Sequence, residues 1–417
     1  MPENFHIDMP EAVRNIIHTI EEHGFKAYAV GGCIRDSILG RNPDDWDITT
    51  SAVPSQIKTF FKRTVDTGIA HGTVTIMIDK TGYEVTTYRI DGEYEDGRHP
   101  KSVEFSDRLV DDLCRRDFTI NAMAYNDTDG FVDEFKGLDD LDTKIIRCVG
   151  EPELRFTEDA LRMMRAIRFS AQLGFTIDEA TWNAIKKLSP SISKISMERV
   201  HVELGKTLMS AHPDYVAQYS EAGLFAPILL VIDNALKSRY KRKILATLQH
   251  TPDNIYLRYA ALFITSTPDE AAKTLRALKL DNKTVNTVSK LVELSKMDIE
   301  ETEPAVRTAL NKYGRDFLPL WHELMMAVIQ ASEDITGISN PAKVKHLLTL
   351  KRLGTDILAR GDCFTIKDLD ISGNDLIEYG LQGHEIGETL KSLLDIVIEN
   401  PKLNDKATLI AMIEHIK

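Results

Sequence analysis

Two consecutive glycines near the start of the chain, Gly31 and Gly32, constrain the local fold more than any other feature. They follow a short apolar run, 26–30, which predicts a buried strand, and they precede 33–39, which predicts a short helix. Because glycine lacks a Cβ atom, the backbone at this turn can approach a ligand closely and direct N–H groups toward it. The N-terminal end of the following helix favours an anion such as phosphate. The pattern therefore predicts a strand, a turn that accepts phosphate, and a helix.

The next apolar stretch carries two aspartates, Asp45 and Asp47, separated by one residue. On a strand, such side chains lie on the same face, close enough to hold hard cations between them. A glycine-backed pocket followed by this pair indicates metal-assisted attack on a nucleotide phosphate. An Asp-x-Asp sequence on its own is also found at solvated sheet edges, and short motifs give many false matches. The rest of the chain decides between these readings.

Length and composition limit the class of protein. At 417 residues the chain should divide into two to four units. No apolar run is long enough to span a membrane, and residues 1–4 lack the start of an export signal. The four cysteines have no paired spacing, which favours reduced thiols in a cytoplasm and argues against a zinc site. The net charge of −13 argues against a protein that coats DNA, but permits an enzyme that holds one RNA through a local basic patch.

Several further elements follow from periodicity. Residues 12–20 predict a helix that Gly24 closes, and 55–61 predict another. Alternating runs at 72–78 and 82–89 predict a hairpin beside the strand that carries the aspartates. Within it, Glu84 is either a third carboxylate of the site or the partner of a surface lysine.

The segment 91–101 has no apolar period and is rich in glycine, proline and charge, which predicts a loop. Arg115 and Arg116 then open a predicted helix. Arginine pairs in two-pronged fashion with phosphate or carboxylate, so Arg116 is a candidate ligand contact. The alternative is an ion pair with Asp111 or Asp112.

From about residue 150 the predicted structure is almost wholly helical. The first of these helices is predicted to begin at Thr157 as N-cap, with Asp159 and Arg162 on one face. Its arginines recur every third residue and form a basic stripe. An exposed helix with internal salt bridges would give the same pattern. However, apolar residues already occupy the buried face of this helix. The stripe of Arg162, Arg165 and Arg168 therefore favours a helix that lines a polar cleft.

Taken together, these motifs resemble the bacterial class II CCA-adding enzymes of the tRNA nucleotidyltransferase and poly(A) polymerase family. The resemblance covers the chain from about residue 10 to the C-terminus. Five segments carry it in order: Gly31-Gly32-x-x-Arg35-Asp36, Asp45-x-Asp47, Arg115-Arg116-Asp117, Glu158-Asp159-x-x-Arg162, and Ser196-Met197-Glu198-Arg199 with Glu203-Leu204.

The resemblance implies an α+β fold, in which a nucleotidyltransferase head with a small mixed sheet precedes an all-helical remainder. It implies a catalytic head at 1–149, a neck that selects the base at 150–205, and tRNA-binding body and tail at 206–330 and 331–417. It also implies that the fifth motif steadies the neck helices. Related enzymes are often homodimers.

The resemblance also assigns roles to residues. Asp45 and Asp47 are expected to be catalytic and to hold two magnesium ions. The expected nucleotide-binding residues are Gly32, Arg35, Arg116, Asp159, Arg162, Arg165 and Arg168. The implied reaction is attack of the tRNA 3′-hydroxyl on the α-phosphate of CTP or ATP, with pyrophosphate leaving.

Base selection can be argued from hydrogen-bond inventory. Cytosine and adenine both present an exocyclic amine beside a ring-nitrogen acceptor. A carboxylate such as Asp159 accepts from the amine, and a guanidinium such as Arg162 donates to the ring nitrogen. Uracil and guanine place a carbonyl where the amine should be, which leaves the carboxylate unpaired at a cost of roughly 1–3 kcal/mol.

The alternative functions are a bacterial poly(A) polymerase or an enzyme that adds only part of CCA. The strand at 67–74 is more similar to the CCA-adding enzymes, and the loop from Asp91 to Pro100 is similar to that of enzymes that add the terminal A. His99 departs from the arginine usual there. Some relatives carry a His-Asp pair of a phosphohydrolase where this chain has Ile264 and Thr265, so no second hydrolytic activity is expected. The basic run 237–243 is either a tRNA contact or a solvated helix face.

Overall fold

The N-terminal part of the chain is built on a seven-stranded mixed sheet in a computed structural model that describes residues 6–92 and 103–416. Its strand order is β3-β4-β5-β2-β1-β8-β9. In chain order these strands are β1 (Ala27–Val30), β2 (Ile48–Thr50), β3 (Thr64–Gly68), β4 (Thr73–Ile78), β5 (Thr81–Thr87), β8 (Ala124–Asn126) and β9 (Gly130–Val132). The central strand β1 is buried along its whole length, as its apolar sequence predicts.

Strand pairing places the predicted hairpin beside the segment that carries the aspartates. Strands β4 and β5 are antiparallel, and β5 runs parallel to β2 with Ile48 opposite Val85. β1 pairs antiparallel with β2 on one side and with β8 on the other. Two short strand pairs complete the β structure: β6 (Arg89–Asp91) with β7 (Val103–Phe105), and β10 (Ile145–Ile146) with β11 (Thr176–Ile177). β11 shows that strand structure continues briefly beyond residue 150, contrary to the prediction.

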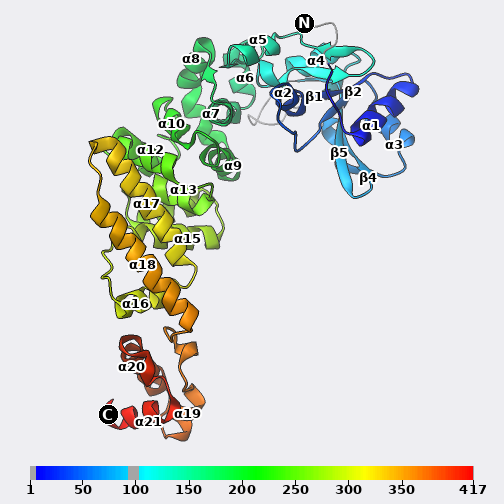
Figure 1. Ribbon diagram of the computed structural model, residues 1–417. Helices are drawn as coiled ribbons and strands as arrows, with labels where there is room; N and C mark the ends of the chain where they lie inside the picture. The colour runs from blue at the N-terminus through cyan, green and yellow to red at the C-terminus, as the bar shows by residue number, and fades with distance from the viewer. Residues whose placement is uncertain (1–5, 93–102, 417) are drawn as a thin grey trace. The chain divides into compact units, whose positions relative to one another are not determined.

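Ten helices of the described chain accompany the sheet in the unit Met1–Leu230 (Figure 1). They are α1 (Glu11–Glu22), α2 (Gly32–Ile38), α3 (Pro54–Phe60), α4 (Leu109–Cys114), α5 (Gly137–Asp142), α6 (Pro152–Glu158), α7 (Leu161–Leu173), α8 (Glu179–Leu188), α9 (Met197–Leu208) and α10 (Ala217–Glu221). Helices α1 and α3 confirm the periodicity at 12–20 and 55–61. Gly24 follows α1 with a φ of +86°, and its N–H closes the helix on the Glu21 carbonyl.

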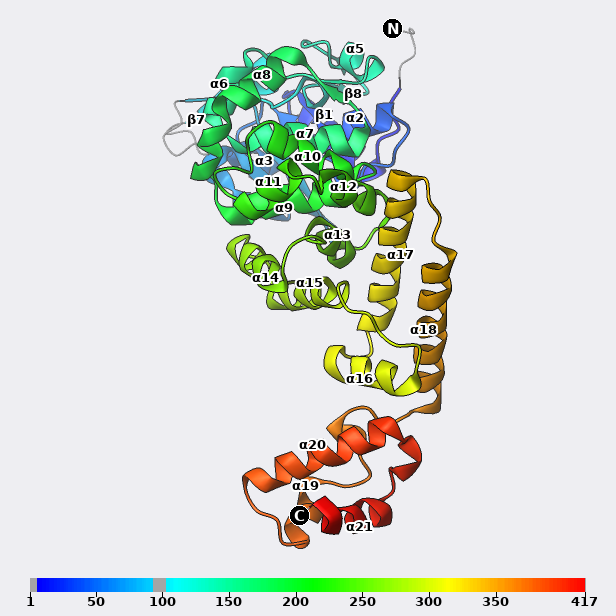
Figure 2. The ribbon, with the colours of Figure 1, turned by 90° about the vertical axis from the view of Figure 1, so that its left-hand side faces the viewer.

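The second unit, Val231–Lys417, contains no strand within its described residues. Its helices are α11 (Leu230–Lys237), α12 (Lys241–His250), α13 (Ile255–Leu262), α14 (Pro268–Ala277), α15 (Asn282–Leu294), α16 (Glu303–Tyr313), α17 (Phe317–Thr336), α18 (Pro341–Arg360), α19 (Gly373–Glu378), α20 (His384–Glu399) and α21 (Lys406–Ile416). The two long helices α17 and α18 lie side by side (Figure 2). A sheet-bearing first part followed by helices confirms the predicted α+β class. The finer division at residues 149, 205 and 330 stays a prediction.

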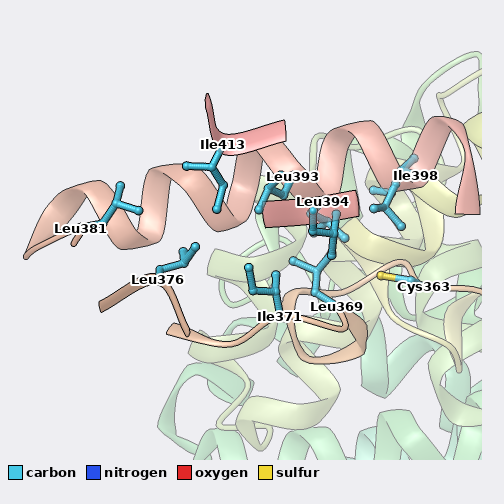
Figure 3. Packing of buried hydrophobic residues seen from close by; sticks show 11 residues of the cluster. Cys363, Leu369, Ile371, Leu376, Leu381, Leu393, Leu394, Ile398 and Ile413 are labelled. Carbon is cyan, nitrogen blue, oxygen red and sulfur yellow. The ribbon is translucent and has the colours of Figure 1, made fainter. Parts of the chain in front are cut away.

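A separate apolar core holds the last helices together (Figure 3). Leu393 and Leu394 of α20 point toward Leu369, Ile371 and Leu376 of the preceding segment, and all are buried. Removing this apolar surface from water stabilises the C-terminal helices against one another. All four cysteines are free thiols, as predicted (Cys33, Cys114, Cys148 and Cys363). Among the described helices, none has the length and apolar character that crossing a membrane requires.

Candidate active site

The glycine turn connects β1 to α2, as predicted (Figure 1). Gly31 adopts a φ of +87°, which disfavours any residue with a Cβ atom. A Cβ atom at this position would also lie 2.8 Å from Nη1 of Arg116. The Gly31 N–H donates to the Met123 carbonyl at 3.1 Å, so the turn is fixed against the middle of the sheet. Glycine is therefore required here by both conformation and close packing.

Asp45 and Asp47 lie just before β2 and not on it, because β2 begins at Ile48. The segment is nevertheless extended, since Val30 N–H of β1 donates to the Asp47 carbonyl at 3.0 Å. Trp46 and Ile48 are buried while both aspartates are exposed. The predicted placement of the pair on one face is therefore correct, although the strand assignment was wrong.

The electrostatics of this pair indicate a site short of positive charge. Asp47 faces solvent, yet surrounding protein atoms partly desolvate its carboxylate and raise its pKa. The Arg116 guanidinium opposes this rise and the Asp45 charge adds to it. Glu84 lies in the same field, because Ile48 pairs with Val85 and their predecessors Asp47 and Glu84 are neighbours. Desolvation and the two aspartate charges raise the pKa of Glu84, and no described lysine forms an ion pair with it.

Arg35 is buried on α2 and is held from three sides. Its guanidinium makes a two-pronged contact with Asp36, at 3.0 and 2.8 Å. Nη1 donates to Oδ1 of Asn121 at 2.5 Å, and the group lies 5.0 Å from the centre of the Phe169 ring. Asn121 in turn donates to Asp117 at 3.0 Å. A continuous polar chain therefore links the first motif to the third.

Arg115 and Arg116 do not open a helix, because α4 ends at Cys114 and Arg115 is its C-cap. A short 3₁₀ turn, Thr119–Asn121, follows instead. Both arginines pair with the fully buried Asp112, at 2.6 and 3.1 Å. Burial alone would raise the pKa of Asp112, but the two guanidinium groups hold it below its ordinary value. The ion-pair alternative for Arg116 is thus present, while the same side chain also lies against Gly31 and near Asp47.

The helix predicted from Thr157 is in fact two helices. Thr157 lies inside α6, where its hydroxyl donates to the Glu153 carbonyl. The chain turns at Asp159, whose side chain accepts from Leu161 N–H at 3.0 Å at the start of α7. The N-cap assignment was therefore wrong, because the capping oxygen comes from Asp159.

Asp159 and Arg162 are each held by a different partner. Arg199 of α9 donates to both oxygens of Asp159, at 3.3 and 2.7 Å. Arg162 donates to Glu158 at 2.7 Å and to the Arg115 carbonyl at 2.9 Å. The two side chains predicted to read the base are thus fixed in place before any ligand arrives.

The remaining arginines of α7 surround one aromatic ring. Arg165 and Arg168 lie 5.3 and 3.9 Å from the centre of Phe169, on the ring that Arg35 also approaches. Arg165 pairs with Asp117 at 2.6 Å, and Arg168 pairs with Glu203 of α9 at 2.6 Å. The fifth motif therefore contributes two ion pairs, Arg199 with Asp159 at the start of α7 and Glu203 with Arg168 within α7. These contacts agree with a role in steadying the helices.

One cavity of about 580 Å³ gathers part of the predicted site. Its head wall comes from α2 and residues 41–47, and its neck wall comes from α7 and α9. It brings together Gly32, Arg35, Asp45, Asp47 and Arg168. The other four predicted residues do not line this cavity: Arg116, Asp159, Arg162 and Arg165.

Comparison with known proteins assigns the family. Residues 27–147 match the poly A polymerase head domain, 174–236 match an RNA and SrmB binding site of polymerase A, and 256–413 match tRNA nucleotidyltransferase domain 2. The CCA-adding enzyme of Pediococcus pentosaceus is 34% identical over 98% of each chain. The chain belongs to the CCA-adding enzyme family.

Other family members differ in how much of the chain they match. The CCA-adding enzyme of Limosilactobacillus reuteri (strain DSM 20016) is 52% identical over 203 residues, so the match spans about half of each chain: 49% of this one and 50% of the relative. The crystal structure of the Bacillus stearothermophilus CCA-adding enzyme in complex with CTP superimposes with a TM-score of 0.75. It is 31% identical and covers 97% of this chain and 96% of that one.

The donor set of this family member suits a hard divalent cation. Mg²⁺ is commonly held by one or two carboxylates together with substrate phosphates. Asp45 and Asp47 offer two exposed carboxylates on one face, and desolvation, together with the charge of Asp45, raises the pKa of Asp47. Within the described ranges no group of three or more His, Cys, Asp or Glu side chains could hold a metal. The pair would therefore act with ligands from the substrate.

Sequence reasoning missed several residues of this family member's site. Asn121 and Phe169 position the arginines, and Arg41, Gln172 and Lys206 line the cavity. Arg41 lies close enough to the aspartate pair in the sequence that its spacing could have flagged it. No local sequence pattern identifies Asn121, Phe169, Gln172 or Lys206 as site residues, because the residues around them in the site come from distant segments.

Proposed function

We propose that the protein adds C, C and A to the 3′ end of tRNA from CTP and ATP, without a template. The observation that supports this most directly is the cavity that joins the Asp45–Asp47 pair to Gly32 and Arg35. In this reaction the RNA 3′-hydroxyl attacks the nucleotide α-phosphate and pyrophosphate leaves. The family of the chain and its match to tRNA nucleotidyltransferase domain 2 support tRNA and nucleotides as the substrates.

In this proposal the head residues hold the reacting phosphates. Asp45 and Asp47 would bind Mg²⁺, which activates the attacking hydroxyl and neutralises charge on the phosphates. Arg35 is already fixed by Asp36 and Asn121, so its guanidinium needs no reordering to meet a phosphate. Gly31 leaves room for the Arg116 guanidinium, and a Cβ atom at Gly32 would lie 3.7 Å from Nη2 of Arg35.

The neck residues would select the base and support the phosphates. Asp159 is oriented by Arg199, and its role would be to accept from the amine of cytosine or adenine. Arg162 is oriented by Glu158, and its role would be to donate to the ring nitrogen. Arg165 and Arg168 are locked by Asp117 and Glu203 and would complete the pocket.

The remaining assignments of the proposal concern the whole chain. Residues 1–149 form the catalytic head and 150–205 the neck, while 206–330 and 331–417 contact tRNA. The reaction takes place in the cytoplasm, where the free thiols stay reduced. A homodimer is the proposed assembly, and light scattering of the purified protein measures it.

The deciding experiment is incubation with tRNA that lacks its 3′ end, labelled CTP and ATP, and Mg²⁺, followed by sequencing of the product. Addition of C, C and A and then arrest is the expected result. A long A tract would instead identify a poly(A) polymerase, and arrest after CC would identify a partial enzyme. The loop similar to that of A-adding enzymes and its His99 lie outside the described residues apart from positions 91 and 92.

A further inference from the structure

The arginines of the site are already paired with carboxylates of the protein. In the cavity, Arg35 pairs with Asp36 and Arg168 pairs with Glu203. The predicted arginines outside the cavity are paired as well. Arg116 pairs with Asp112, Arg162 with Glu158, and Arg165 with Asp117. Their charge is partly neutralised before a polyanionic substrate arrives, so cations without a carboxylate partner would add to the charge that Arg35 offers a phosphate.

Lys206 is one such cation on the neck wall. Arg199, Glu203, Lys206 and Ser210 recur at helical spacing along α9 and just beyond its end, so they lie on one face. Arg199 and Glu203 are engaged with Asp159 and Arg168. Lys206 is exposed and lines the cavity with Ser210, and among the described residues it has no ion-pair partner. A lysine in this position is a mobile point charge available to a ligand.

Arg41 occupies the head wall of the same cavity. Gly40, with a φ of +68°, turns the chain after α2, and the Arg41 N–H donates to the Asp36 carbonyl at 2.8 Å. The backbone is thus fixed, whereas the Arg41 side chain is exposed and lines the cavity. No described carboxylate forms an ion pair with it, although Asp44 and Asp45 follow closely in the sequence.

We propose that Lys206 and Arg41 bind phosphate oxygens of the substrate from opposite walls of this cavity. The inference rests on the proposed function and adds two positioning residues to it. With Asp45 and Asp47 engaged by a cation, Lys206 and Arg41 are the cations of the described lining that have no ion-pair partner, and the exposed Asp44 of the same lining is the charge that opposes them. The phosphate belongs either to the nucleotide triphosphate or to the 3′-terminal nucleotides of the RNA, since both bring the same chemistry to the cavity.

The test uses the full chain and compares single variants. Lys206→Ala and Arg41→Ala each remove one charge, and Lys206→Arg and Arg41→Lys each retain it. Lys194→Ala is the matched control, because Lys194 is an exposed lysine of the same unit that does not line the cavity. Equilibrium binding is measured separately for ATP and for tRNA that ends in CC. Loss of a charge-assisted hydrogen bond should weaken one of these affinities about tenfold in each alanine variant.

Weakened ATP binding with tRNA binding kept assigns the two cations to the triphosphate, and the reverse assigns them to the RNA. In either case the charge-retaining variants should recover most of the affinity. Alanine variants that bind both ligands as tightly as Lys194→Ala overturn the proposal. Because binding is measured without turnover, this result is separate from failure of wild-type protein to add C and A, which would instead reject the proposed function.

Discussion

At the scale of single residues, Asp45 and Asp47 give the plainest prediction. Replacing either by alanine removes a carboxylate assigned to the metal and not to RNA. C and A addition should both be abolished, while tRNA affinity stays within a factor of about two because neither carboxylate is assigned to RNA. Addition assays and filter binding measure the two quantities, with Asp142→Ala, an exposed aspartate outside the cavity, as control. Near-normal addition by either variant would reject the metal assignment.

Asn121 is predicted to act as a positioning residue. It is the bridge between Arg35 and Asp117, so Asn121→Ala leaves one prong of a buried guanidinium unpaired. The KM for CTP and ATP should rise about tenfold, since a hydrogen bond to a charged group contributes about 1.5–3 kcal/mol. Steady-state kinetics measure this at a temperature well below the thermal midpoint of the variant, which separates the effect from unfolding. Wild-type KM values would show that Arg35 is held well enough by Asp36 and Phe169.

The residues that sequence reasoning found are those whose chemistry repeats locally. The glycine turn and the aspartate pair were predictable because spacing alone places their backbones and side chains. Asn121 was not, since it meets Arg35 across 86 residues of sequence. Glu203 is recognisable only as part of a motif, and its pairing with Arg168 depends on how α7 and α9 pack. Long-range pairs of this kind are set by tertiary structure, which a local pattern does not encode.

At the scale of elements, the junction of α6 and α7 carries the base-selection hypothesis. A double variant, Asp159→Arg with Arg162→Asp, inverts the donor and acceptor offered to the base and should suit U and G. We expect C and A incorporation to be lost, with a small gain of U or G when each nucleotide is tested separately on the same tRNA. The gain is limited because the new arginine faces Arg199 and the new aspartate faces Glu158.

A control for that repulsion adds Arg199→Asp and Glu158→Arg, which restores opposite charges at both contacts. The quadruple variant should show a larger gain of U or G than the double variant. If both variants keep the wild-type preference for CTP and ATP, this junction does not select the base.

The pairing of α17 and α18 gives a prediction of pH dependence. His322 of α17 is buried, and burial together with Lys351 of α18 lowers its pKa below the ordinary 6.5. The unfolded chain therefore binds a proton at a pH where the folded chain does not. The contribution of His322 to stability is complete above about pH 6.5 and declines as pH falls toward the folded pKa.

Between about pH 7.5 and about pH 5.5, the thermal midpoint should fall more in the wild type than in His322→Leu. His384→Leu is the control, because His384 is exposed on α20 and should leave the wild-type decline intact. Scanning fluorimetry of the full chain measures the midpoints. Equal declines in the wild type and His322→Leu would contradict the assignment.

Helix boundaries show where periodicity was insufficient. The pattern from 157 to 168 reads as one helix, but the chain turns at Asp159, which has a φ of −143° and caps α7 instead of continuing α6. Arg115 and Arg116 read as a helix start because arginine favours helices, yet they follow α4 and turn toward buried Asp112. Buried Asp112 thus holds the two arginines at the second place, while at the first the half-buried Asp159 pairs with Arg199.

At the scale of the whole molecule, the family resemblance predicted the α+β class, and the helical spacing beyond residue 150 agreed with it. The length of the chain predicted two to four compact units but not where they divide. The structure divides into two, Met1–Leu230 and Val231–Lys417, so helices α6 to α10 belong to the sheet-bearing unit. Their packing in that unit depends on ion pairs such as Arg165–Asp117, whose members lie 48 residues apart.

The proposed function requires an acidic molecule with a net charge of −13 to bind tRNA through a local excess of positive charge. The basic run 237–243 ends α11 and begins α12. Lys237 pairs with Asp233 and Arg239 stacks on Tyr240, whereas Arg242 and Lys243 are exposed at the start of α12. These two side chains are therefore the members of the run best placed to meet RNA phosphates.

The double variant Arg242→Ala with Lys243→Ala should raise the KM for tRNA and leave the KM for CTP unchanged. For each phosphate ion pair that the substitutions remove, the plot of log affinity against log salt should flatten by about 0.7–0.9, because fewer counterions are released. The matched control is Lys273→Ala with Arg276→Ala, which removes the same charges from exposed positions on α14 of the same unit. A slope change confined to the first variant would place tRNA on α12. Equal slopes in both variants and the wild type would leave the run as a solvated helix face, and tRNA would have to be held by other cations of the chain.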